Sequence, residues 1–291
     1  MAIFAMSLDL LIGYTGLVSL GHAAFFGLAG YLLAFAAPEF QPANLWSSLF
    51  LTMMFCAIFA TVIGFITLRT SGIYFIMVTL AISQMLYFFI HDSKVAGGSD
   101  GVYIYMRPDA TFFGWKPFDL ENISDFYYFT LTLLVLTYCF LRALVRSVFG
   151  RVLSGIRLNE SRMNSLGYPT FRYKVICFVF SGTLAGVAGY LSAAQFGVVN
   201  PDMLGWHMSG NVLVMVILGG MGTLLGPAMG AFILLLLELI FQTLPSIGGV
   251  NLSKHWHLFM GGAIVLVALF LPAGVAGLIR GKSQTRQPVD D

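Results

Sequence analysis

Long runs of apolar residues, separated by short polar connections, extend along this chain almost from end to end. We place nine apolar segments at residues 1–13, 16–37, 45–68, 72–90, 127–146, 175–200, 206–222, 226–244 and 254–279. A helix that crosses the roughly 30 Å hydrocarbon core of a bilayer needs about 20 apolar residues, and most of these segments approach that length. The pattern predicts an all-α fold, a polytopic transmembrane helix bundle of about eight to ten spans.

The first of these segments is too short to cross a bilayer as a helix. The residues that follow Met1 rise only about 18 Å before the first break, at roughly 1.5 Å per residue. Two interpretations follow: a partial or re-entrant helix, or a first span whose true beginning lies upstream of Met1. We expect the second.

Composition and charge agree with a membrane protein and give it an orientation. Of the 291 residues, 58% are hydrophobic and 10% are charged, whereas soluble domains carry roughly 25% charged residues. Residues 142–174 contain seven Lys or Arg and one acid, while residues 91–125 contain six acids and three basic residues. Cytoplasmic loops carry the excess of Lys and Arg, so the first region is expected in the cytoplasm and the second outside. This charge pattern reflects topology and does not indicate nucleic-acid binding.

We therefore expect one transmembrane domain over residues 1–280, with a cytoplasmic loop at residues 147–174. Residues 281–291 are short and polar, so we expect them to form a disordered cytoplasmic tail.

A basic, amphipathic run at residues 150–169 predicts a short helix within that loop. Asn159 suits the N-cap of a helix and Glu160 its first turn, while Gly167 can take the left-handed conformation that often ends one. The proline two residues later prevents the helix from continuing. We expect a helix of about two turns, from Glu160 to Leu166.

One face of this short helix is apolar and another is basic. Met163 and Leu166 lie three residues apart and share a face, whereas Arg162 lies on a different one. Such a helix can bury apolar side chains in a partner protein while arginines, Arg157 included, set its orientation. The alternative is a basic loop that meets lipid headgroups.

Glycine is abundant, with 32 residues, many at the small-xxx-small spacing that lets helices approach closely in membranes. The glycines for which we expect a helix-packing role are Gly16, Gly21, Gly182, Gly186, Gly222, Gly226 and Gly230. Two glycine-rich turns, at residues 13–21 and 219–227, are alike, and each joins a segment to its return near the cytoplasmic face. They indicate a weak internal repeat, although glycine-rich turns can also be alike by chance.

Four polar residues inside apolar segments are candidates for lining a substrate path, because unpaired polar groups are costly in lipid. They are Ser19, His22, Gln84 and Glu238. Gln84 and Glu238 lie about 18 Å along their helices, near mid-membrane. Apart from Asp9 in the first segment, Glu238 is the only acid at that depth. For His22 and Glu238 the alternative is a side chain that is hydrogen-bonded within the bundle.

The sequence holds no convincing pattern of a catalytic or metal site. Gly277–Ser283 resembles a phosphate-binding loop, but it has three residues between its glycines where four are needed, and it follows an apolar segment. His255 and His257 supply only two ligands beside a tryptophan, which favours an aromatic anchor at the membrane surface. We therefore expect no enzyme activity, no cofactor and no metal.

Five blocks of the sequence, taken in order, resemble a known family. They are residues 8–27, Ser71–Phe75 with Gln84–Tyr87, Gly97–Gly101, Gly150–Tyr168, and Val216–Pro227 followed by Leu269–Gly274. Together they are similar to the LivM-type permease subunits of branched-chain amino acid ABC importers, in the LivH/LivM permease family. Members of that family usually carry further residues before the position that matches Met1, which strengthens the expectation of a missing first span.

The resemblance implies a function and a set of partners. The chain would be the transmembrane permease of an ATP-driven importer for leucine, isoleucine and valine, in the plasma membrane of a bacterium or archaeon, which is the inner membrane in a Gram-negative cell. Its partners would be a second, LivH-type permease, two ABC ATPase subunits, an extracytoplasmic amino-acid-binding protein and the lipid bilayer. ATPase docking would fall to the short cytoplasmic helix, through Arg157, Asn159, Glu160, Arg162, Met163, Leu166 and Gly167.

Two other functions stay open on the sequence. A urea or short-chain amide ABC importer permease has the same architecture and would change only the substrate, although Gly97–Gly101 and Gly219–Gly222 look closer to the amino-acid branch. An ion-coupled secondary transporter would work without an ATPase, but it should show several acids near mid-membrane.

Overall fold

The structure of this chain is a computed structural model. It describes residues 1–37, 41–111, 116, 118–243, 246–247, 250–251, 256–271 and 274–279. Its helices are α1 (Ala2–Thr15), α2 (His22–Ala36), α3 (Leu45–Thr67), α4 (Ile73–His91), α5 (Ile123–Arg146), α6 (Val148–Leu158), α7 (Glu160–Ser165), α8 (Thr170–Phe196), α9 (Trp206–Gly219), α10 (Leu225–Gln242), α11 (Trp256–Phe270) and α12 (Gly274–Ile279). Short 3-10 turns and strands complete it: η1 (Lys94–Ala96), η2 (Gly98–Asp100), η3 (Pro201–Leu204), β1 (Val102–Tyr103), β2 (Val198–Val199), β3 (Ser246–Ile247) and β4 (Val250–Asn251).

The prediction of a polytopic helical membrane protein is confirmed. Among the described residues, five helices are long and apolar enough to cross a membrane, and they are α3, α4, α5, α8 and α10. Shorter apolar helices accompany them, at Ala2–Thr15, His22–Ala36, Trp206–Gly219 and Trp256–Val267. Within the described part of the chain, the apolar helices thus fall in the nine segments that the hydrophobic pattern marks.

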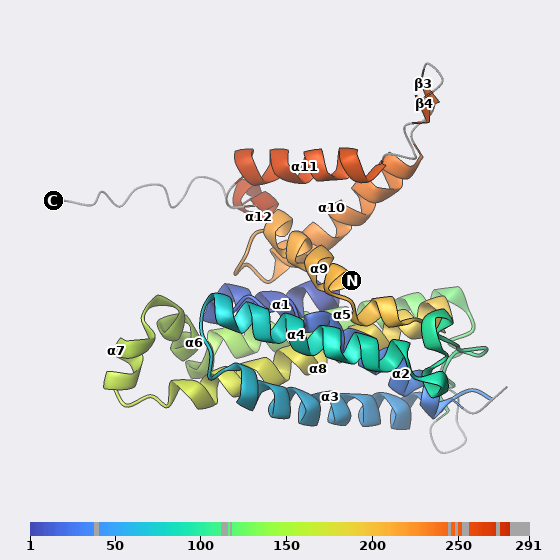
Figure 1. Cartoon of the computed structure of the whole chain (residues 1–291), viewed down its shortest axis with the longest axis horizontal. Coiled ribbons are helices and arrows are strands. Elements are labelled where there is room, and N and C mark those ends of the chain that lie inside the picture. Colours follow the sequence, from blue (N-terminus) through green and yellow to red (C-terminus); the bar gives the residue numbers. More distant parts are fainter. Residues whose placement is uncertain are drawn as a thin grey trace.

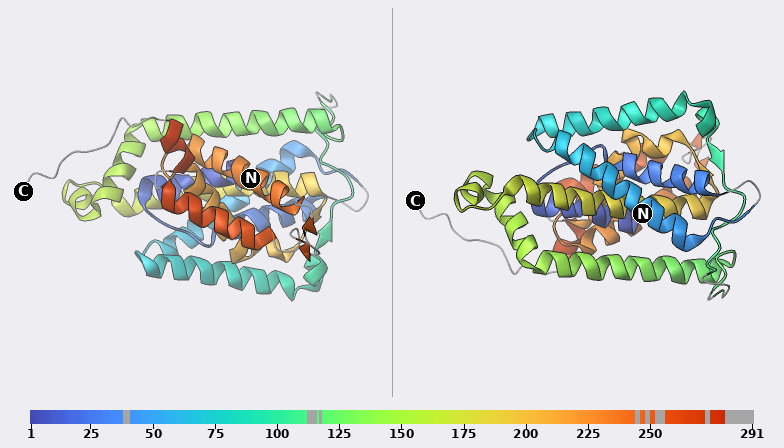
Figure 2. Two further views of the ribbon diagram at one scale, coloured as in Figure 1. Left: turned by 90° about the horizontal axis from the view of Figure 1, so that it is seen from above. Right: turned by 90° about the horizontal axis from the view of Figure 1, so that it is seen from below.

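Figure 1 shows how the helices are arranged. Helices α1, α3, α4 and α8 run along the long axis of the molecule, and α9 to α12 form a group on one side of them. Helices α6 and α7 lie at one end, and the loops between α4 and α5 lie at the other (Figure 1). Seen along the perpendicular direction, α4 and α5 flank the bundle on opposite sides (Figure 2). The end with α6 and α7 is the one that the charge pattern predicts to be cytoplasmic.

Helix ends differ from the predicted segments where a glycine or proline changes the backbone. The segment predicted at 16–37 begins as a helix only at His22, because Gly16 takes a left-handed conformation (φ 75°) and ends α1. Helix α8 begins directly after Pro169, five residues before the predicted start at 175. The segment predicted at 254–279 divides into α11 and α12. Residues 280–291, with the predicted tail, lie outside the described residues.

The core of the bundle is formed by α1, α2 and α8. Helix α1 is buried around nearly its whole circumference, and it packs against α8, α9 and α10. Helix α8 packs against α2 and α3, where glycines on α8 leave no space for a side chain. A Cβ atom at Gly186 would lie 2.6 Å from the Sγ atom of Cys56, and one at Gly189 would lie 2.6 Å from the carbonyl carbon of Phe26. The helix backbones therefore meet almost directly, as small residues allow in membranes.

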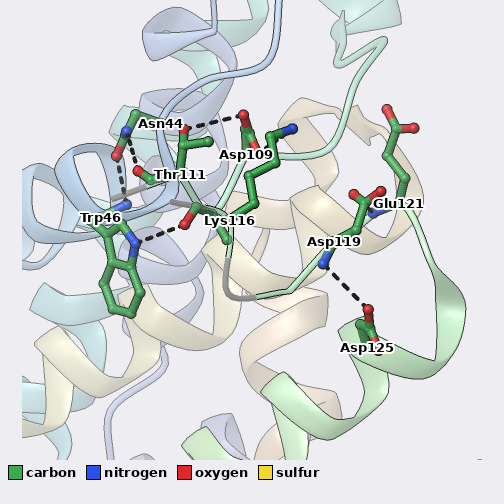
Figure 3. Close-up of polar contacts among 9 residues, drawn as sticks. Asn44, Trp46, Asp109, Thr111, Lys116, Asp119, Glu121 and Asp125 are labelled. Atoms are coloured by element: carbon green, nitrogen blue, oxygen red, sulfur yellow. Dashed lines mark hydrogen bonds and ion pairs between the residues drawn. The ribbon is translucent and has the colours of Figure 1, made fainter. Parts of the chain in front are cut away.

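The outer connection between α4 and α5 is tied to the helix ends by polar contacts. Strand β1 pairs antiparallel with β2, which directly follows α8. The Asn44 side chain accepts hydrogen bonds from the first amides of α3, and its Nδ2 atom donates to the Thr111 carbonyl at 3.0 Å (Figure 3). Asp109 and Lys116 form an ion pair at 3.0 Å, and this hydrogen bond raises the pKa of Lys116. The described parts of this connection are thus tied to the end of α8 and to the start of α3.

Candidate functional site

The predicted cytoplasmic helix forms where the sequence places it. Helix α7 spans Glu160–Ser165, and the Asn159 side chain caps it by accepting a hydrogen bond from the Arg162 amide at 2.9 Å. After the helix, Gly167 takes a positive φ of 88°, and the Tyr168 amide donates to the Met163 carbonyl at 3.2 Å. Both predicted helix ends are confirmed, and the local sequence explains them. We call α6, α7 and the turn to Tyr168 the docking segment.

The side chains of the docking segment face different ways. Leu158 and Leu166 are exposed, at 87% and 65%, and Arg162 is exposed as well. Met163, which shares a helix face with Leu166 in the sequence, is half-buried against Gly155 of α6. The two leucines are the most exposed apolar side chains of the docking segment, which also exposes Val148 and Tyr168, and Met163 joins α7 to α6.

Glu160 is held by an ion pair within the chain. Its carboxylate lies 2.5 Å from the Nζ atom of Lys174 in α8, and the Lys174 side chain is only 8% exposed. The Thr170 hydroxyl lies 3.2 Å from the same carboxylate and 2.9 Å from the Asn164 side chain. A nearly buried ammonium needs a partner, so Glu160 first of all fixes the position of α7 against α8. The sequence pattern predicted Glu160 at a partner surface. It did not reveal the ion pair, because Lys174 lies 14 residues further along the chain.

Arg157 also makes a contact inside the chain. Its Nη1 atom donates a hydrogen bond to the carbonyl oxygen of Gly13, in the last turn of α1. Carbonyl groups in a last helical turn lack intrahelical partners and form the negative end of the helix, so an arginine is favourable there. Arg157 thus contacts the end of α1 while it stays an exposed residue of α6.

His22, a predicted path residue, lies fully buried between α1, α2 and α8. Its Nε2 atom is 3.0 Å from the Ser7 hydroxyl and 3.3 Å from the Ser181 hydroxyl. Each serine donates its own proton to a backbone carbonyl, Ser7 to Phe4 and Ser181 to Ser7. The serine oxygens are thus left as acceptors, which assigns the imidazole proton to Nε2. In this structure His22 is a hydrogen-bonded packing residue, stacked on the Phe4 ring.

The other path candidates lie apart from one another. Ser19 is buried in the connection after α1 and accepts a hydrogen bond from the Gly21 amide at 3.3 Å. Gln84 on α4 is half-buried, and its Nε2 atom has no partner among the described residues. Glu238 on α10 accepts a hydrogen bond from the exposed Gln242 side chain at 3.1 Å. The structure does not bring the four predicted residues together.

Two pockets lie toward the outer ends of α2 and α4. One, of about 470 Å³, is lined by the end of α2 and by the loop from Lys94 to Met106, with Gly97 and Gly101 in its wall. The other, of about 400 Å³, is apolar and lies between α2, α3 and α4. None of the four predicted path residues lines either pocket. The block at Gly97–Gly101 therefore contributes to a cavity at the end of α2.

The glycines that were expected to pack helices fall into two groups. Four of them lie where a side chain would strike a neighbouring helix: Gly21 against α4, Gly182 and Gly186 against α3, and Gly230 against α9. The others lie at or next to turns: Gly16 and Gly222 take a positive φ, and Gly226, near the start of α10, lies against Thr223 and the Gly219 carbonyl of α9. The two turns that are alike in sequence meet in the structure, because Gly13 lies against Gly222.

Asp9 is the polar residue whose importance the sequence did not reveal. It is fully buried in α1, and its two carboxylate oxygens accept hydrogen bonds from the amides of Gly222 at 2.6 Å and Leu224 at 3.3 Å. One sequence signal was present: Asp9 and Gly13 lie four residues apart, and so share a helix face. Their partner, the turn between α9 and α10, lies more than 200 residues away.

The histidines that the sequence weighed as metal ligands are not part of a cluster among the described residues. No group of three or more His, Cys, Asp or Glu in the described ranges is placed to hold a metal ion. His255 lies outside the described residues, and the His257 ring lies tilted against Trp256 with ring centroids 3.7 Å apart.

Comparison with known proteins identifies relatives along nearly the whole chain. A family model described as the branched-chain amino acid transport system / permease component matches residues 1–269. The high-affinity branched-chain amino acid transport system permease protein LivM of Escherichia coli is 26% identical over 297 residues, which cover 96% of this chain and 68% of that protein. The LivM protein of Salmonella typhimurium matches equally well.

A shorter similarity extends to a different transport system. The autoinducer 2 import system permease protein LsrC of Klebsiella pneumoniae is 31% identical over 134 residues, which cover 44% of this chain and 37% of that protein. No solved structure matches this chain.

Proposed function

Because this chain belongs to the branched-chain amino acid transport system permease family, we propose that it carries branched-chain amino acids into the cell as the membrane subunit of an ATP-driven importer. The family makes it an ABC-type permease without catalytic activity of its own. The observation that carries the choice of substrate is the extent of the similarity. LivM proteins match 96% of the chain, while the autoinducer 2 permease matches 44%.

The proposed complex contains a second, LivH-type permease, two ATPase subunits and an extracytoplasmic amino-acid-binding protein. ATP binding would draw the ATPase subunits together and move the docking segment. The bundle would then open outward, accept an amino acid from the binding protein and return after hydrolysis, which is alternating access by a shift of population. The carboxy terminus would lie in the cytoplasm, in agreement with the basic residues at that end.

Uptake by the reconstituted complex tests the substrate. We expect ATP-driven accumulation of labelled leucine in vesicles that contain this chain, its partner permease, the ATPase subunits and the binding protein. Labelled urea and autoinducer 2 are the comparison substrates, each with the same ATP supply. Uptake of either one without uptake of leucine would refute the proposed substrate, and uptake driven by an ion gradient without ATP would refute the ABC mechanism.

The docking role is proposed for the exposed residues of α6 and α7. Leu166→Ala is expected to raise the dissociation constant for the ATPase subunits about tenfold, because burial of one leucine contributes roughly 1.5 kcal/mol or more to binding. The measurement is a titration of detergent-solubilised permease with ATPase subunits. Leu258→Ala is the matched control, since Leu258 is 74% exposed on α11, away from α7. Equal affinities of the two variants would show that α7 does not dock.

A further inference from the structure

Five residues from three distant parts of the chain meet near the cytoplasmic end of α1. They are Asp9 and Gly13 of α1, Arg157 of α6, and Gly222 and Leu224 in the turn between α9 and α10. We call this group the inner junction. A Cβ atom at Gly13 would lie 2.6 Å from the Gly222 Cα atom, so the turn rests directly on the helix.

Two side chains of helix α1 hold the turn through the backbone groups of the turn. The Asp9 carboxylate accepts the amides of Gly222 and Leu224, and the Tyr14 hydroxyl donates to the Gly222 carbonyl at 3.1 Å. Leu224 has a φ of 56°, and among the described residues it is the only one other than glycine with a positive φ. A backbone in this region persists only where its surroundings hold it, and here the Asp9 carboxylate does so.

Arg157 connects the docking segment to the same place. Its hydrogen bond to the Gly13 carbonyl crosses from α6 to α1. A Cβ atom at Gly222 would lie 3.6 Å from the Arg157 Nη1 atom and 3.4 Å from the Gly13 oxygen, so the guanidinium also borders the turn. On its other side, α6 is joined to α7 by the contact between Gly155 and Met163.

These contacts form a continuous path from α7 to α9 and α10. A displacement of α7 reaches α6 through Met163, reaches the end of α1 through Arg157, and reaches the turn through Asp9. The turn joins α9 to α10, which stand on one side of the bundle in Figure 1, while α1 packs against α8 on the other. The inner junction is therefore placed where motion of the docking segment can change the packing between these two groups of helices.

We propose that Arg157 and Asp9 are the positioning residues that transmit motion of the docking segment to the α9–α10 turn. This inference rests on the proposed function, because it takes α7 as the site where the ATPase subunits dock. It goes beyond that function by naming the residues that link docking to the helix bundle. Arg157, which is exposed on α6, thereby has a role within the permease through its hydrogen bond to α1.

The test measures how much leucine is transported per ATP hydrolysed by the reconstituted complex. Arg157→Gln removes the charge from the end of α1, and we expect the ratio to fall at least tenfold while the ATPase subunits still co-purify. Arg157→Lys keeps the charge and should recover part of the ratio. Arg172→Gln is the matched control, because Arg172 is an exposed arginine of α8 outside the docking segment, and it should leave the ratio unchanged.

Asp9→Asn tests the second link. The side-chain amide of this variant has one oxygen that can accept a hydrogen bond and an NH2 group that can only donate. One of the two backbone N–H groups would therefore lose its acceptor. We expect the same loss of leucine transported per ATP as with Arg157→Gln. A purely structural role would instead lower the yield of complex and leave the ratio of the remaining complex unchanged.

A second measurement follows the turn itself. In the wild-type complex, a non-hydrolysable ATP analogue should change hydrogen exchange at residues 219–226, and in Arg157→Gln this change should be absent. An equal change in both proteins would overturn the inference, as would an unchanged transport ratio in both junction variants. If the wild-type complex transported no leucine with ATP, the proposed function would fail instead, which is a separate result.

Discussion

Gly189→Ala adds a single methyl group and is expected to destabilise the permease strongly. The added Cβ atom would strike the Phe26 carbonyl group, which is helix backbone and cannot rotate away. Overpacking of a core costs about 1 to 3 kcal/mol, and we expect the upper end of that range because α2 and α8 form a central contact of the bundle. The midpoint of thermal unfolding in detergent should fall by several degrees.

The matched control for Gly189 is Gly210→Ala in α9. Both glycines lie inside helices, but a Cβ atom at Gly210 would meet nothing within 4 Å. Alanine favours a helix over glycine by up to about 1 kcal/mol, so this variant should be neutral or slightly more stable. If the two variants unfolded at the same temperature, that result would contradict the close packing of α8 against α2.

Glu160→Gln is expected to lower the stability of the permease as well, because Lys174 would lose its ion-pair partner. The Lys174 ammonium is nearly buried, and loss of the carboxylate would strand its charge. Breaking a fully buried pair costs about 3 to 5 kcal/mol; because Glu160 is 42% exposed, we expect about 2 kcal/mol. The double variant Glu160→Gln/Lys174→Met removes the charge as well, so it should unfold close to the wild-type temperature.

This double-mutant cycle also separates the two roles that Glu160 could have. If Glu160 contacted an ATPase subunit directly, the double variant would bind that subunit as weakly as Glu160→Gln does. If it only positions α7, binding should return together with stability. A double variant that is less stable than Glu160→Gln would contradict the role of the ion pair.

Local signals in the sequence were sufficient for the docking segment as a helix. Asn159 and Gly167 act within four residues of the helix ends, so the cap hydrogen bond and the left-handed turn could be predicted without knowing the fold. The orientation of Met163 could not be predicted in this way, since it depends on Gly155 lying opposite it. Helix periodicity says which side chains share a face, but it does not say which faces are covered.

For the predicted path residues, too, the sequence indicated a need for a partner but not which partner it would be. A polar side chain in an apolar segment indicates that a partner is needed, and His22 has two serines that come from α1 and α8. Whether such a residue faces a cavity or a neighbouring helix depends on which segments become neighbours. The sequence could not distinguish these two possibilities for His22, and the structure places it in the packed core.

By itself, the sequence determined that this protein is a helical membrane protein, where most of its apolar helices lie, which family it resembles, and that a capped helix follows Asn159. These properties depend on apolar length, on charge excess and on contacts a few residues apart, all of which are written along the chain. Only the tertiary structure decided that Asp9 binds the turn at Gly222, and that Arg157 turns inward to Gly13. The physical reason is that buried polar groups need partners, and these partners come from segments 144 and 213 residues away.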